Sequence, residues 1–155
     1  MSKFRISHLV FAFVFMHLLF PMKYAEAGGA DDLILAVWGF DTAKAAALIE
    51  GGVDVNGKDA NGTYPLMLAC SYKDNDEMIE LLLEKGADPN IFGPNGETPL
   101  GLAARYSLKA VKMLVDKGAD VNAKNEKGHT ALWWAVKMDQ KEVVEFLKGK
   151  GAKEQ

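Results

Sequence analysis

The side chains that could act as nucleophiles, general bases or metal ligands are few and widely spaced. Beyond residue 27 the chain contains one histidine, His129, and one cysteine, Cys70. A zinc site usually draws four ligands from histidine and cysteine, so these two residues cannot supply one. Cys70 stands in the apolar segment 66–70, where a free cysteine packs like a small hydrophobic residue. We therefore expect Cys70 to be structural.

The serines and carboxylates also lack a catalytic context. Ser71 and Ser107 are outside the Gly-x-Ser-x-Gly pattern that presents a nucleophilic serine. The acidic segments 31–32 and 74–76 stand where helices should begin, and carboxylates there cap the helix and complement its dipole. Residues 74–76 lack the glycine and distal glutamate of a calcium loop. We expect no catalytic residue, metal site or cofactor, and hence no enzyme.

Composition indicates one globular domain of mildly acidic character. The chain has 155 residues, 49% hydrophobic and 25% charged, with a net charge of −3. Without residues 1–27 the charge is −5, from 15 basic and 20 acidic side chains. Nucleic-acid binding needs a basic surface to neutralise phosphates, so we expect no nucleic-acid partner. A single cysteine forms no internal disulfide, so packing alone must hold the domain, which we expect to be a monomer.

The first residues have the pattern of an export signal. Lys3 and Arg5 precede the apolar run 9–20, Pro21 follows it, and Ala25 and Ala27 stand at the positions that signal peptidase recognises. We predict a Sec-type signal peptide over residues 1–27, cleaved after Ala27. An uncleaved anchor is the alternative, but the run is shorter than the roughly 20 residues that span a bilayer. The predicted location is the periplasm, with secretion as an alternative and no membrane contact after cleavage.

A sequence repeat organises the remainder of the chain. Gly52, Gly86, Gly118 and Gly151 recur at nearly equal intervals of about 33 residues, a period typical of stacked structural units. A Gly-Ala-Asp-x-Asn phrase recurs around these glycines, and a leucine follows each of its asparagines after ten residues: Leu66, Leu100 and Leu132. Each unit predicts a short first helix, such as 100–104, a second helix, such as 78–83, and a polar turn. No unit can bury its apolar face alone, so such units stack.

These phrases resemble those of the ankyrin-repeat family over residues 30–152. The resemblance implies an all-α solenoid of about four helix-turn-helix repeats with β-turn fingers, in a domain spanning 28–155. The approximate repeats are 30–57, 58–91, 92–123 and 124–155.

Three departures from the family pattern concern packing. The turn near 73–76 has one extra residue and the turn near Ser107 lacks one, so we expect an irregular edge. Gly101 stands in a helix and should admit a close neighbour, either Trp133 or a ligand. Trp134 takes a position where the pattern has a buried leucine, so we expect it in the core.

Resemblance also implies binding through the concave face and the fingers, and the register selects residues that should point there. The candidate protein-binding residues are Trp38, Tyr72, Phe92, Asn95, Arg105, Tyr106, His129, Lys137 and Met138. Aromatic residues, Met and Arg are enriched in interface cores. Two residues leave alternatives open. Trp38 could instead cover the N-terminal end of the stack, and Trp133 could be structural or interfacial.

The chain is similar to small exported bacterial ankyrin proteins that protect a cell against its own peptidoglycan-cutting enzymes. That resemblance implies an inhibitor or immunity protein that covers the active site of a periplasmic D,D-endopeptidase of the penicillin-binding-protein type. An accessory factor for a periplasmic enzyme such as a catalase is one alternative. A secreted effector that binds a host protein is another.

Overall fold

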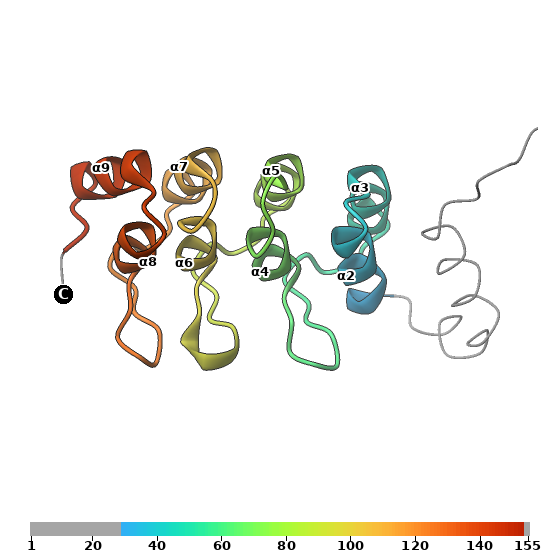
Figure 1. The fold of residues 1–155 in the computed structure, drawn as a ribbon. Helices are drawn as coiled ribbons and strands as arrows, with labels where there is room; N and C mark the ends of the chain where they lie inside the picture. Colours follow the sequence, from blue (N-terminus) through green and yellow to red (C-terminus); the bar gives the residue numbers. More distant parts are fainter. Residues whose placement is uncertain (1–28, 154–155) are drawn as a thin grey trace, which may run out of the picture.

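The computed structural model describes residues 29–153 as a row of helix pairs (Figure 1). The predicted signal peptide lies outside these residues. The first helices of the four pairs form one layer and the second helices form another, with fingers extending beyond the first layer (Figure 1). The first, second and third fingers are residues 58–63, 92–97 and 124–129. The first helices are α2 (Ala30–Trp38), α4 (Pro65–Cys70), α6 (Pro99–Ala103) and α8 (Ala131–Lys137). The second helices are α3 (Thr42–Glu50), α5 (Asp76–Glu84), α7 (Leu108–Asp116) and α9 (Lys141–Gly149). The predicted all-α ankyrin solenoid is confirmed.

Local residue chemistry begins and ends these helices. The hydroxyls of Thr98 and Thr130 accept hydrogen bonds from the backbone N–H groups of Gly101 and Trp133, which caps α6 and α8. Gly86 follows α5 in the left-handed region, with φ of 91°. A side chain is strained there, so glycine is the residue that allows the chain to reverse.

Asparagines from the repeated phrase join each unit to the next. The Asn90 amide donates to the Gly118 carbonyl at 3.0 Å and accepts from the Asp120 backbone N–H at 2.8 Å. Asn56 makes the equivalent pair of bonds to Gly86 and Asp88, and Asn122 makes them to Gly151 and Lys153. The phrase therefore satisfies backbone groups that the helix ends and loops leave unpaired.

The core runs along the contact between the layers and contains the repeated alanines and leucines. Leu33, Leu66, Leu100 and Leu132 are each at most 2% exposed, as are Ala36, Ala69, Ala103 and Ala135. Cys70 is 1% exposed, and burial raises the pKa of its thiol, with a further contribution from the Asp76 charge. Cys70 is therefore a core residue without thiolate character.

The irregular edge is present where it was predicted. The residue before the N-cap of the second helix is left-handed in three units: Phe40 (φ 56°), Asp74 (φ 62°) and Asp139 (φ 51°). In the third unit the N-cap Ser107 lies 7 residues after Leu100, against 8 or 9 in the other units, and residues 104–107 contain no positive φ. Ser107 caps α7 and donates its hydroxyl to Asp76 at 2.7 Å.

Two packing predictions need correction. Trp134 is only partly buried, because its ring lies at the surface of the core beneath the Arg105 guanidinium. The neighbour that approaches Gly101 is Trp134 and not Trp133. A Cβ on Gly101 would lie 3.6 Å from Trp134 Cδ1 and 3.2 Å from Thr98 Oγ1.

Candidate protein-binding surface

Large apolar side chains remain exposed where the first helices end. Trp38 is 55% exposed, Tyr72 40%, Tyr106 37% and Met138 41%. Their exposure follows the register, and their part in binding stays a prediction. Trp38 has more than half of its surface accessible, and both its role in covering the N-terminal end and its role in binding stay predictions.

Phe40 joins this surface and was not predicted. Its ring is 49% exposed and meets the Tyr72 ring edge-on, with the centroids 5.8 Å apart. The equivalent left-handed residues are aspartates, which tolerate this backbone conformation, whereas an aromatic residue there costs about 1–2 kcal/mol. Strain of this kind concentrates at functional sites. The available signal was the register, since Phe40 stands directly before the N-cap Asp41, at the position that Asp74 and Asp139 take in other units.

Arg105 is held within the structure and does not project freely. Its guanidinium bonds to the Glu97 carboxylate at 3.1 Å and lies 3.6 Å from the centre of the Trp134 ring. The Arg105 and Glu97 side chains are only 20% and 23% exposed. Glu97 also accepts a hydrogen bond from the buried Asn125. Arg105 therefore joins the second finger to α8, and its part in protein binding stays a prediction.

His129 and Lys137 enclose Trp133. The His129 and Trp133 rings stack at 3.5 Å with an angle of 4°, and the Lys137 ammonium lies 4.6 Å from the Trp133 ring centre. Trp133 also meets Trp134 edge-on at 4.7 Å. Trp133 thus packs within this cluster. Part of its surface is exposed, and an interfacial role for that part stays a prediction.

The two remaining candidates lie on the second finger and in different surroundings. Asn95 is exposed with φ of 59°, and its carbonyl accepts from the Glu126 backbone N–H of the next finger at 3.1 Å. Phe92 is 58% exposed and lines a hollow of about 230 Å³ with Thr98, Leu100 and Asp120. A different hollow, of about 200 Å³, contains Ser71 and Glu97. The hollow that Phe92 lines contains none of Tyr72, Arg105 and Tyr106, and whether these residues act together in binding stays a prediction.

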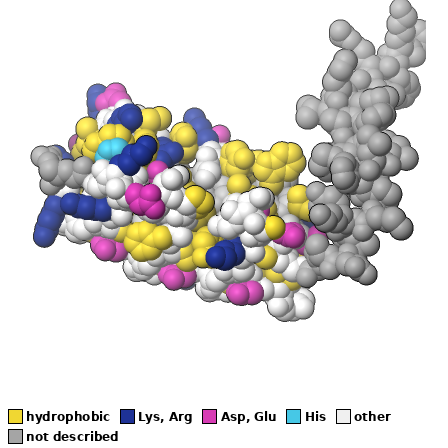
Figure 2. Space-filling view, turned by 90° about the horizontal axis from the view of Figure 1, so that it is seen from below, with side chains coloured by type: hydrophobic (Ala, Val, Ile, Leu, Met, Phe, Trp, Pro, Cys, Tyr) yellow, Lys and Arg dark blue, Asp and Glu magenta, His cyan; other side chains and the backbone are white. Residues whose placement is uncertain are grey.

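Charge is unevenly distributed over the helix pairs. Figure 2 shows Lys and Arg side chains gathered at the end that carries α8 and α9, with few over the first two pairs.

Two carboxyl groups of the first two pairs have a lowered pKa. Lys85 donates to Glu50 at 2.8 Å and lowers the pKa of that carboxyl. On the first finger, burial alone would raise the pKa of Asp59. The backbone N–H groups of Thr63 and Asn61 donate to its carboxylate and lower the pKa on balance.

Among the described residues, no group of three or more His, Cys, Asp or Glu side chains is arranged to hold a metal ion. None of the helices in 29–153 has the length and hydropathy needed to cross a bilayer.

Comparison with known proteins agrees with this geometry. The family described as ankyrin repeats (3 copies) matches residues 33–125 and 91–155. An ankyrin repeat-containing protein of Treponema pallidum is 34% identical over 90 residues, which is 58% of this chain and 30% of that protein. Human 2-5A-dependent ribonuclease is 38% identical over 72 residues, 46% of this chain and 10% of the ribonuclease. Mouse ankyrin repeat domain-containing protein 40 is 33% identical over 72 residues, 46% of this chain and 20% of its own length. The chain thus spans less than a third of each of these relatives.

Proposed function

The chain belongs to the ankyrin-repeat family, whose repeats indicate a protein-binding module, and on that premise we propose that it is an exported inhibitor. Its target in this proposal is a periplasmic peptidoglycan hydrolase of the D,D-endopeptidase type, and its role is self-protection. The observation that carries the binding role is the set of exposed apolar side chains where the first helices end. Large apolar groups grouped at a surface are typical of interaction sites.

Three features support the more specific role. The pattern over residues 1–27 is that of an export signal, which would bring the chain to the compartment where the cell wall is cut. The acidic body disfavours nucleic acid as a partner. Four units offer enough surface for a standard interface of roughly 800 Å² per partner, which can cover an enzyme's active site.

The test is cleavage of purified peptidoglycan by each periplasmic D,D-endopeptidase of the native host, with and without this protein. We expect at least one enzyme to release soluble fragments more slowly when the protein is present. The Tyr72→Ala/Tyr106→Ala variant should lose this effect while its helical circular dichroism is unchanged, because both side chains are exposed. If no endopeptidase is slowed, the self-protection role is wrong and only the protein-binding role remains.

A further inference from the structure

The solenoid is divided into an acidic half and a basic half. Residues 29–90, the first two helix pairs, contain 4 basic and 12 acidic side chains, a net charge of −8. Residues 91–153, the last two pairs, contain 11 basic and 7 acidic side chains, a net charge of +4. Opposed charges on a partner would orient it along the stack during encounter.

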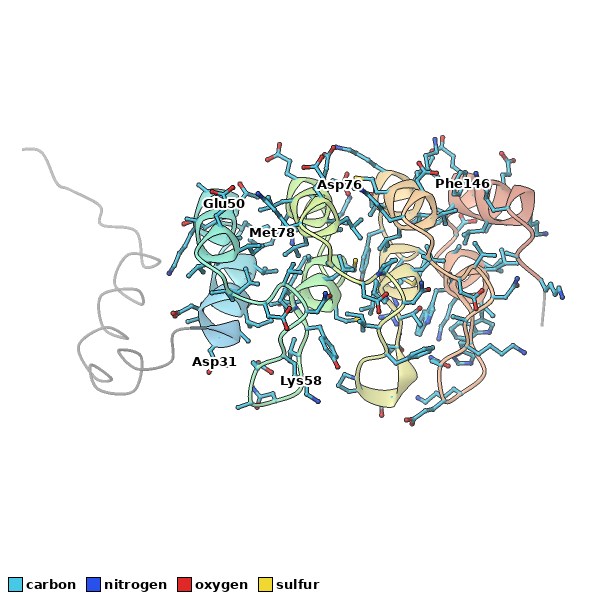
Figure 3. All side chains as sticks on the ribbon, turned by 180° about the vertical axis from the view of Figure 1, so that it is seen from behind. Asp31, Glu50, Lys58, Asp76, Met78 and Phe146 are labelled. Atoms are coloured by element: carbon cyan, nitrogen blue, oxygen red, sulfur yellow. The ribbon has the colours of Figure 1, made fainter. Side chains whose placement is uncertain are left out.

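The acidic half contains a hollow beside the exposed Phe40–Tyr72 pair. The hollow has a volume of about 340 Å³, and its lining includes Phe40, Asp74, Asp76, Glu77 and Lys109. It lies where the first helices turn into the second helices. Figure 3 shows Asp76 in the layer of α5, away from the finger that carries Lys58.

Two carboxylates of this hollow have no ion-pair partner among residues 29–153. Asp76 already accepts the Ser107 hydroxyl, and Lys109 is paired with Glu80 at 3.7 Å. In the part of the chain that the structure describes, neither Asp74 nor Glu77 forms an ion pair, and both are exposed. The three acidic side chains and one lysine leave the hollow with a net charge of −2.

Three aromatic rings of the basic half are covered by cations of the chain itself, whereas Phe92 and Tyr106 of that half are covered by no cation within residues 29–153. In the basic half, cations of the chain itself lie over the rings of Trp133, Trp134 and Phe146. In the acidic half, no cation within residues 29–153 lies over Phe40 or Tyr72. A guanidinium or ammonium group is attracted both by an aromatic ring and by a carboxylate.

We propose that the acidic aromatic edge, formed by Phe40, Tyr72, Asp74 and Glu77, docks an arginine- or lysine-bearing segment of the partner protein. The cation rests against the two rings, and the two carboxylates neutralise its charge. This inference rests on the protein-binding function and does not depend on the partner being an endopeptidase.

The experiment titrates the full-length ¹⁵N-labelled protein with two capped five-residue peptides, one alternating glycine with arginine and the other alternating glycine with glutamate. Amide signals identify where each peptide binds, and their shifts give its affinity. We expect the arginine peptide to move signals at 40 and 72–77 and to bind at least about fivefold more tightly than the glutamate peptide. Added salt should weaken this binding, because exposed charges are screened.

Two double variants of equal net charge distinguish binding at the hollow from general attraction to the acidic half. Asp74→Asn/Glu77→Gln should lower the affinity for the arginine peptide by about fivefold, and Phe40→Asn should lower it by about threefold. Asp31→Asn/Glu84→Gln removes the same charge outside the hollow and should leave the affinity within about twofold. Equal weakening by both charge variants, shifts confined to other residues, or no preference for arginine would overturn the proposal. Failure of the peptidoglycan assay alone would overturn only the self-protection role.

Discussion

Replacing Arg105 by alanine should destabilise the domain, although Arg105 stands at a register position that faces outward. The variant removes a half-buried hydrogen bond to Glu97. A hydrogen bond to a charged group is worth about 2 kcal/mol. The variant also removes a guanidinium that lies 3.6 Å from the Trp134 ring centre, and a contact of this kind is worth about 1 kcal/mol. We expect the free energy of unfolding to fall by about 2–3 kcal/mol, which corresponds to a Tm lower by roughly 6–12 °C.

Lys109→Ala is the matched control, because it breaks an ion pair that is more exposed. The Lys109 and Glu80 side chains are 58% and 51% exposed, and their charged atoms are 3.7 Å apart. The loss for such an exposed pair should stay below about 0.5 kcal/mol. Urea denaturation followed by circular dichroism measures both variants. Arg105→Lys should recover only part of the stability, since an ammonium cannot both pair with the carboxylate and stack on the ring as a planar fork does. The reasoning is refuted if Arg105→Ala costs no more than Lys109→Ala.

Three further predictions can be checked by the same denaturation measurements. Asn90→Ala removes the hydrogen bonds to the Gly118 carbonyl and from the Asp120 N–H, both of which are exposed, so water can partly replace them. It should therefore cost about 1 kcal/mol, and a cost below about 0.3 kcal/mol would contradict this. Phe40→Asn relieves left-handed strain and loses the ring contact with Tyr72. Because these effects offset each other, stability should change by less than about 0.5 kcal/mol, and a loss above about 2 kcal/mol would show that no strain is relieved. Asp59 has a lowered pKa in the folded state. The ionised carboxylate therefore contributes to the free energy of unfolding above about pH 4, and this contribution is lost as the pH falls through the folded pKa. Wild type should therefore lose more stability than Asp59→Asn on acidification from about pH 5 to about pH 2.5, and equal losses would assign the acid sensitivity to other groups.

The repeat, the helix order and the exposed register positions could be predicted from sequence because they depend on local chemistry at a fixed period. Glycine at the helix end, threonine at the N-cap and asparagine between units each perform a task that the residue type itself reveals. The same reasoning located the irregular edge, since a changed spacing between Leu66 and Gly86 must be absorbed in the turn.

Contacts between units were not predictable in this way. Arg105 is joined to Glu97 and Trp134, and the choice of Trp134 over Trp133 as the neighbour of Gly101 depends on side-chain directions across two helices. Phe40 was missed because an apolar residue next to a helix end suggests core packing, whereas the left-handed turn directs it outward. Export and the identity of the partner remain predictions.

The central claim is that this chain binds a protein through the edge where its first helices end. The most direct test is to place a photo-reactive phenylalanine analogue at position 72 in the native host and irradiate the living cells. The matched control places the analogue at Lys117, which is exposed at the end of α7. We predict that one discrete protein is cross-linked from position 72 and is absent from position 117. Cross-links of equal yield from both positions, or none from position 72, would contradict the claim.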